Sequence, residues 1–132
     1  MNNDVKRLVL IVEKELNNAS LNLPYKNFVS EIINLLKTKV MDEKIKYDVL
    51  VELFKYVKFG DTITSIDMRG DNSIKFSALN NIKDAIDKNT LSQNNINDLN
   101  KINELCLSYI LDPLKLTKAF DKFYRENPNA RI

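Results

Sequence analysis

The sequence predicts an all-α protein, a single compact bundle of about six helices over residues 1–132, with an irregular loop or a small β-hairpin near residues 60–73. Three observations support this. Apolar residues recur at helical spacing along most of the chain. Helix breakers are rare, with only two glycines and three prolines. The composition, 44% hydrophobic and 29% charged over 132 residues, is that of one globular domain.

The first two helices are predicted by apolar residues at i, i+3, i+4 and i+7. The first covers residues 4–18, and the second begins at Pro24, a residue favoured in the first helical turn, and reaches Val40. The residues expected to face inward are Val5, Leu8, Val9, Val12 and Leu16 in the first helix and Tyr25, Phe28, Val29, Ile32, Ile33 and Leu36 in the second.

The third helix is predicted to begin after Asp42, which can act as its N-cap. Its end is predicted at Gly60, because glycine readily adopts the left-handed conformation that ends helices. Lys55 and Lys58 in the last turn would complement the helix dipole. The inward residues expected here are Ile45, Val49, Leu50, Phe54 and Val57.

Three further helices follow. The fourth is expected over residues 73–88, and Ser92 can cap a fifth that carries its apolar residues as far as Ile110. Asp112 followed by Pro113 is typical of a helix start, and a sixth helix is predicted to end before the sequence NPNARI. Three helix pairs could stack side by side as a short solenoid, but a closed bundle is the expected arrangement.

Between the third and fourth helices lies KFGDTITSIDMRGDNSIKF, residues 58–76. Its β-branched TITSIDM segment could pair with SIKF as a small hairpin, and the alternative is an irregular loop or a short helical turn. Any given tripeptide occurs by chance in some chains of this length, so Arg69-Gly70-Asp71 is not interpreted as an adhesion motif.

The composition argues against most enzyme chemistry. The chain has no histidine, which removes the commonest general base and metal ligand. One cysteine, Cys106, cannot form an internal disulfide or a Cys/His zinc site, and it favours a reducing compartment such as the cytoplasm. Two separated glycines cannot build a phosphate-binding loop. The apolar run LVLIV is far too short to span a membrane.

Carboxylates are the remaining candidates for catalysis or metal binding. Asp61, Asp67 and Asp71 do not have the spacing of a calcium-binding loop. Asp84 and Asp87 alternate with lysines, as on an ordinary solvated helix face. We therefore predict a protein that is not an enzyme, with no metal and no cofactor.

A basic stripe is predicted on the C-terminal helix. Four basic residues at i, i+3, i+7 and i+10 fall within about 80° on a helical wheel. Such a stripe could follow a nucleic-acid backbone, or it could be the polar face of an amphipathic helix. The four residues are Lys115, Lys118, Lys122 and Arg125.

The predicted function is that of a small cytoplasmic protein-binding module, an inhibitor or an immunity (antitoxin-like) protein that neutralises a partner enzyme, possibly a toxin, by direct binding. Long ordered loops in compact domains are often functional, and the segment around residues 60–73 is the longest predicted here. The alternative is a nucleic-acid-binding accessory protein that uses the basic stripe. The predicted partner-binding residues are Tyr56, Phe59, Asp61, Asp67, Arg69 and Asp71.

Overall fold

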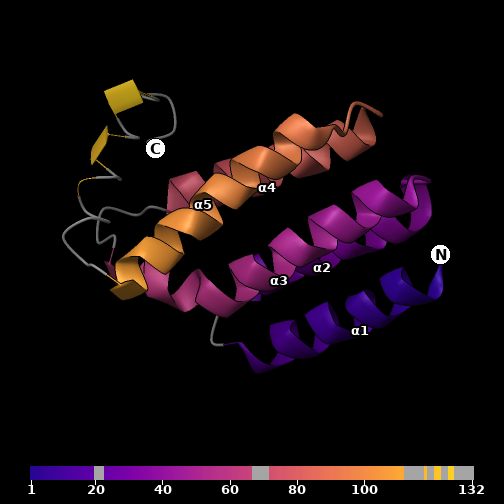
Figure 1. Cartoon of the computed structure of the whole chain (residues 1–132), viewed down its shortest axis with the longest axis horizontal. Helices are drawn as coiled ribbons and strands as arrows, with labels where there is room; N and C mark the ends of the chain where they lie inside the picture. Colours follow the sequence, from indigo (N-terminus) through magenta and orange to yellow (C-terminus); the bar gives the residue numbers. More distant parts are fainter. Residues whose placement is uncertain (20–22, 67–71, 112–117, 119–120, 123–124, 127–132) are drawn as a thin grey trace.

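Five α-helices follow one another along the chain in the computed structural model, which describes residues 1–19, 23–66, 72–111, 118, 121–122 and 125–126 (Figure 1). No strand occurs among these residues, so the predicted all-α class is confirmed. The predicted sixth helix lies mostly outside them, and the count of six is not supported. The helices are α1 (Asn3–Asn18), α2 (Leu23–Lys39), α3 (Glu43–Ile66), α4 (Asn72–Asp87) and α5 (Gln93–Leu111).

Short polar side chains begin three of these helices. The Oδ1 atom of Asn2 accepts a hydrogen bond from the backbone N–H three residues on, at 2.8 Å. Asp42 accepts from the N–H groups two and three residues on, at 2.9 and 3.1 Å, which confirms it as the N-cap of α3. The N–H of Ser92 donates to Asn95 Oδ1 at 3.0 Å, the return half of a capping box. These bonds satisfy N–H groups that have no partner within the helix.

The predicted end of the third helix is wrong. α3 continues through Gly60 to Ile66, so the segment TITSI is helical and is not the first strand of a hairpin. Only residues 67–71 separate α3 from α4, and they lie outside the described residues. A glycine inside a helix costs only about 1 kcal/mol relative to alanine, which the packing of a long helix readily offsets.

The helical conformation of Gly60 gives a direct test. Gly60→Ala is expected to raise the free energy of unfolding by about 0.5–1 kcal/mol, because alanine loses less conformational entropy than glycine on entering a helix. Denaturation by urea, followed by circular dichroism, measures this change. If Gly60 instead ended the helix in the left-handed conformation, the same substitution would lower stability, since alanine is disfavoured there.

The odd-numbered helices α1, α3 and α5 lie side by side and point in the same direction (Figure 1). The backbone N–H of Asn2, just before α1, donates to Glu43 Oε2 at the start of α3 at 3.0 Å. This bond and the nearby Lys46 ammonium hold the pKa of Glu43 below its ordinary value. Glu52, within α3, is bonded to Asn103 at a similar depth in α5. These contacts establish the parallel register of the first layer.

The even-numbered helices α2 and α4 form a second layer that runs in the opposite direction. Glu31 of α2 pairs with Lys83 of α4 at 3.0 Å, and this carboxylate raises the pKa of Lys83. Lys39 and Asp87, at the far ends of the same two helices, pair at 3.3 Å. The described helices therefore form the compact all-α bundle that the sequence predicts, arranged in two layers of opposite direction. α4 packs against α2 and α5.

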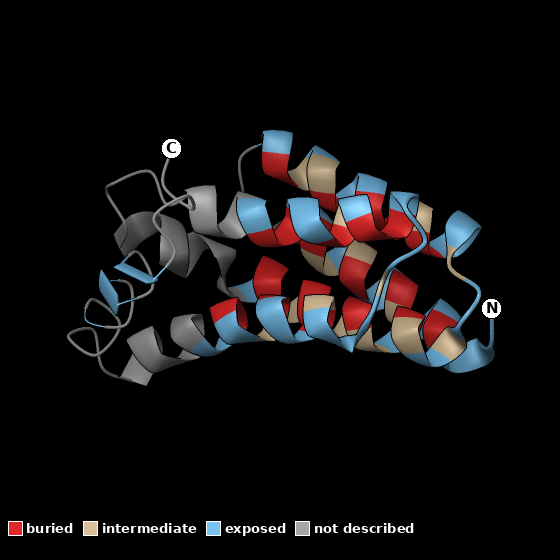
Figure 2. Cartoon of the chain, turned by 90° about the horizontal axis from the view of Figure 1, so that it is seen from above, coloured by how far each residue is buried: buried red, intermediate tan, exposed pale blue. Residues whose placement is uncertain are grey.

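The core lies between the two layers, where the buried sides of the helices face one another (Figure 2). α3 occupies the middle of the first layer and packs against α1, α2 and α5. Most apolar residues predicted to face inward are buried or half-buried. The largest side chains that are fully buried are Tyr56, Ile32, Ile33, Leu36, Leu50, Leu53, Leu79 and Ile82.

Candidate functional site: a pocket between the α2–α3 and α4–α5 turns

Among the predicted partner-binding residues, the structure describes the side chain of Tyr56 alone. Tyr56 is only 1% exposed and belongs to the hydrophobic core. Phe59 and Asp61 fall on the last turns of α3, where the backbone is helical and the side chains lie outside the described set. The remaining three, Asp67, Arg69 and Asp71, lie outside the described residues.

The predicted basic stripe is described at three of its four positions. Lys118, Lys122 and Arg125 have helical backbone and exposed side chains, whereas Lys115 lies outside the described residues. The Nε of Arg125 donates to the backbone carbonyl of Asp121 at 3.4 Å, four residues earlier. These cations are therefore accessible to solvent and to a binding partner.

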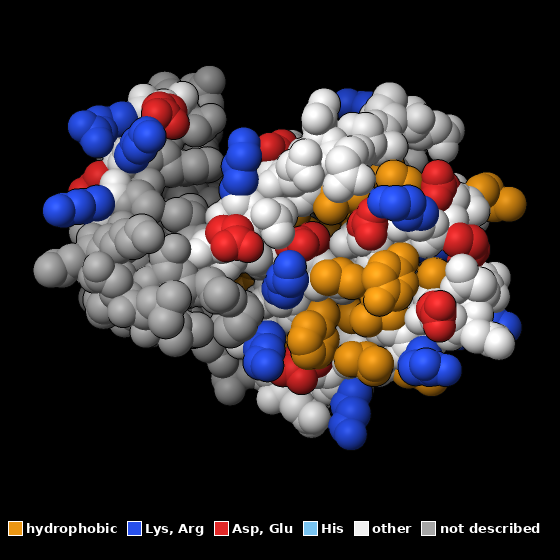
Figure 3. Space-filling view, in the orientation of Figure 1, with side chains coloured by type: hydrophobic (Ala, Val, Ile, Leu, Met, Phe, Trp, Pro, Cys, Tyr) orange, Lys and Arg blue, Asp and Glu red, His pale blue; other side chains and the backbone are white. Residues whose placement is uncertain are grey.

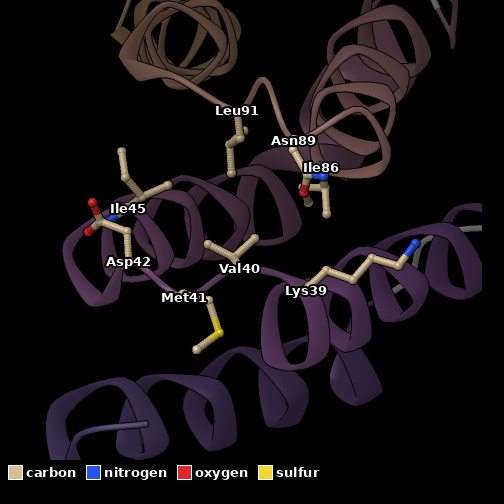
Figure 4. A pocket seen from close by; sticks show the side chains of 8 residues that line it. All are labelled: Lys39, Val40, Met41, Asp42, Ile45, Ile86, Asn89 and Leu91. Atoms are coloured by element: carbon tan, nitrogen blue, oxygen red, sulfur yellow. The ribbon is translucent and has the colours of Figure 1, made fainter.

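A pocket of about 200 Å³ lies at the end of the molecule where α2 and α4 end (Figure 4). One side is the turn between α2 and α3, and the other is the end of α4 with the turn into α5. The two turns meet because α2 and α4 are parallel neighbours and end at the same level. The pocket is lined by Lys39, Val40, Met41, Asp42, Ile45, Ile86, Asn89 and Leu91.

The pocket has a mixed wall, in which five of the eight lining residues are apolar but polar atoms make up the larger part of the exposed lining. Val40, Ile45 and Leu91 are half-buried, and Figure 4 shows Leu91 and Val40 pointing toward each other from opposite turns. Met41 is 87% exposed, the largest exposure among the large hydrophobic residues that the structure describes. Methionine is flexible and polarizable and is used at surfaces that adapt to a partner. An apolar group entering the pocket would therefore cover side chains that now face water.

The polar groups at the pocket hold the two turns in place. Lys39 is paired with Asp87, and the Asp42 carboxylate caps α3. Asn89 has φ 56°, the left-handed conformation that asparagine tolerates better than most residues. Its N–H donates to the carbonyl of Ile86 at 3.2 Å, and the following N–H donates to Ala85 at 2.8 Å, which together form a Schellman motif at the end of α4.

A buried polar network joins α3 to α5, and the sequence analysis did not identify it. Glu52 and Asn103 are 6% and 2% exposed. The Nδ2 of Asn103 donates to the Glu52 carboxylate at 2.8 Å and to its backbone carbonyl at 2.9 Å. Lys55 and Asn100 each donate to the same carboxylate at 3.1 Å. One feature of the sequence could have predicted this network. Asn103 is a polar residue four positions after Leu99, and therefore lies on the apolar face of α5.

The described residues contain neither a metal-binding cluster nor a helix that could span a membrane. Within the ranges that the structure describes, no three His, Cys, Asp or Glu residues lie close enough together to hold a metal ion. No described helix combines the length and the hydropathy needed to cross a bilayer.

Comparisons with known proteins found no similarity to report. The chain matches no protein family, no curated protein and no solved structure.

Proposed function

We propose that this chain is a non-enzymatic protein-binding module whose partner inserts an apolar side chain into the pocket between the two turns. The pocket carries this proposal. Its volume of about 200 Å³ is below the roughly 300–1,000 Å³ of typical small-molecule sites, but it suits a single buried side chain. Interface affinity is usually concentrated in a few such anchored side chains.

In this proposal the module acts as an inhibitor or immunity-type protein, which binds a partner enzyme and covers its active site. The absence of histidine from the chain and the partnered charges at the pocket support binding rather than catalysis. The protein would act in the cytoplasm, consistent with its single cysteine, and would need no metal or cofactor.

Substitution of Met41 by aspartate is expected to abolish partner capture while leaving the fold intact. Met41 is almost fully exposed, so the change costs little stability, but it places a charge among the apolar residues that line the pocket, where binding of an apolar side chain would desolvate it. The measurement is affinity capture from cells of the native host with the wild-type chain and the variant as baits, followed by identification of proteins bound specifically.

The matched control is Leu23→Asp. Leu23 is another strongly exposed apolar residue, at the opposite end of α2 from the pocket. This variant is expected to capture the same partner as the wild type. Equal capture by Met41→Asp and Leu23→Asp would show that the pocket does not hold the partner and would contradict the proposal.

A second candidate function is nucleic-acid binding through the basic stripe, favoured by the exposure of Lys118, Lys122 and Arg125. Because phosphate contacts release counterions, binding should weaken steeply as salt increases. Reversal of Lys118 and Lys122 to glutamate should remove it, and no fluorescence anisotropy change with DNA or RNA at low salt would exclude it.

A further inference from the structure

The outer face of the first layer carries an apolar surface over α1 and α3. On α1 it is formed by Leu8 and Ile11, and on α3 by Tyr47 and Val51. Ile11 and Tyr47 are 45% and 43% exposed, while Leu8 and Val51 are half-buried. Figure 3 shows hydrophobic side chains gathered on this face, with charged side chains around them. A contiguous apolar surface rimmed by polar groups is typical of a protein interface.

The charges at the two ends of this surface differ between the two helices. On α1, Asp4 and Glu15 flank the apolar pair, so that residues 4, 8, 11 and 15 form one acidic-ended strip at helical spacing. On α3, Lys44 lies three residues before Tyr47, and Lys58 lies seven residues after Val51, with the half-buried Phe54 between them. We call these the α1 strip and the α3 strip. One ends in carboxylates and the other ends in ammonium groups.

The lysines of the α3 strip remain accessible despite their contacts within the chain. Lys44 donates to Asp48 at 2.7 Å, yet its side chain is 78% exposed. Lys58 is exposed and lies over the Phe54 ring, with its Nζ 5.9 Å from the ring centroid. Both ammonium groups can therefore donate a hydrogen bond to a carboxylate of another molecule.

The two strips are in register. α1 and α3 are parallel, and the bond from Asn2 to Glu43 joins residues 41 positions apart, so residues with that separation lie at about the same height. Asp4 is then level with the start of α3, within about one residue of Lys44. Glu15 is within two residues of the height of Lys58, or about 3 Å at a helical rise of 1.5 Å per residue. The charged ends of the two strips thus lie at matching levels.

We propose that this face binds a second copy of the same chain, related by a two-fold axis that runs parallel to α1 and α3. This axis places the α1 strip of each copy on the α3 strip of the other. Leu8 and Ile11 then pack on Tyr47 and Val51 of the second copy. Asp4 meets Lys44 of the second copy, and Glu15 meets its Lys58. The interface is isologous, so every contact occurs twice.

The charges select this axis over a two-fold axis perpendicular to the helices. The perpendicular axis would place each strip on its own counterpart, with carboxylates facing carboxylates and lysines facing lysines. Like charges placed opposite each other disfavour such a complex, whereas exposed opposite charges mainly fix orientation. The apolar strips supply the association, and the charged ends decide how the two copies are arranged.

Two half-reversed chains test this geometry. The first carries Asp4→Lys with Glu15→Lys, and the second carries Lys44→Glu with Lys58→Glu. Each alone is expected to be monomeric, because its two strips then have the same charge. An equimolar mixture is expected to form a heterodimer. Both strips of the first chain then end in basic residues and both strips of the second chain end in acidic residues, so each strip faces one of opposite charge. Sedimentation velocity over a concentration series measures the masses.

The wild-type chain is expected to double its mass as concentration rises, and circular dichroism verifies that each variant remains folded. Lys101→Glu, a reversal at an exposed residue of α5, which carries neither strip, is the control and should dimerise like the wild type. A wild-type chain that stays monomeric at all concentrations, or half-reversed chains that do not associate with each other, would overturn the proposal. The two strips share no residue with the pocket, so either proposal can fail without the other.

Discussion

Substitution of Asn103 by alanine is expected to lower the free energy of unfolding by about 2–4 kcal/mol. The variant loses the two hydrogen bonds from Asn103 Nδ2 to Glu52, one to the carboxylate and one to the backbone carbonyl. Both acceptors remain buried, and a buried charge that loses a hydrogen bond cannot recover it from water. Urea denaturation of the two proteins, followed by circular dichroism, measures the difference.

Asn100→Ala is the matched control for this prediction. Asn100 donates one hydrogen bond to the same carboxylate but is partly exposed, so water can replace it and the expected loss is about 1 kcal/mol or less. The double variant Glu52→Leu with Asn103→Leu removes both partners and should recover most of the stability lost in Asn103→Ala. A double variant that is less stable than Asn103→Ala would contradict this expectation. It would show that the hydrogen bonds between Glu52 and Asn103 make a net contribution to the free energy of unfolding that apolar packing does not replace.

Substitution of Leu53 by alanine is expected to cost about 2–5 kcal/mol. Leu53 is completely buried on α3, the helix that packs against both neighbours in its own layer and against α2. Removal of its isobutyl group leaves a cavity in the middle of the stack, where three surrounding helices limit how far the structure can relax. Thermal and urea denaturation should both show the loss.

Leu10→Ala provides the comparison, since Leu10 is the same residue type but strongly exposed on α1. Its expected effect lies within about 0.5 kcal/mol of zero. Similar losses for Leu10→Ala and Leu53→Ala would contradict the placement of the core between the two layers.

Local signals in the sequence predicted most of the helices correctly. Asp42 was expected to cap α3 and does so, and Ser92 stands immediately before α5 as expected. The helix end predicted at Gly60 was wrong, although the sequence pattern for a helix C-terminus was as clear there as anywhere in the chain. A C-cap glycine and a glycine inside a helix differ by only about 1 kcal/mol, so packing beyond the local sequence decides between them.

The candidate sites were harder to predict than the helices. Tyr56 lies off the apolar stripe that the sequence indicates for α3, yet it is buried, because α3 is covered on three sides by other helices. Residues of the pocket such as Met41 and Leu91 come from turns far apart in the sequence. No periodicity within either turn indicates that the two turns meet.

The helical class of this protein and the start of most helices follow from local interactions, because helical hydrogen bonds join residues four apart and caps act within one turn. The layer order, the parallel register of α1 with α3, the burial of Glu52 with Asn103, and the pocket all depend on how the helices pack. Each of these features depends on contacts between residues more than forty positions apart. The free energy of such a contact depends on which distant residue packing brings close, and the local sequence does not indicate that residue.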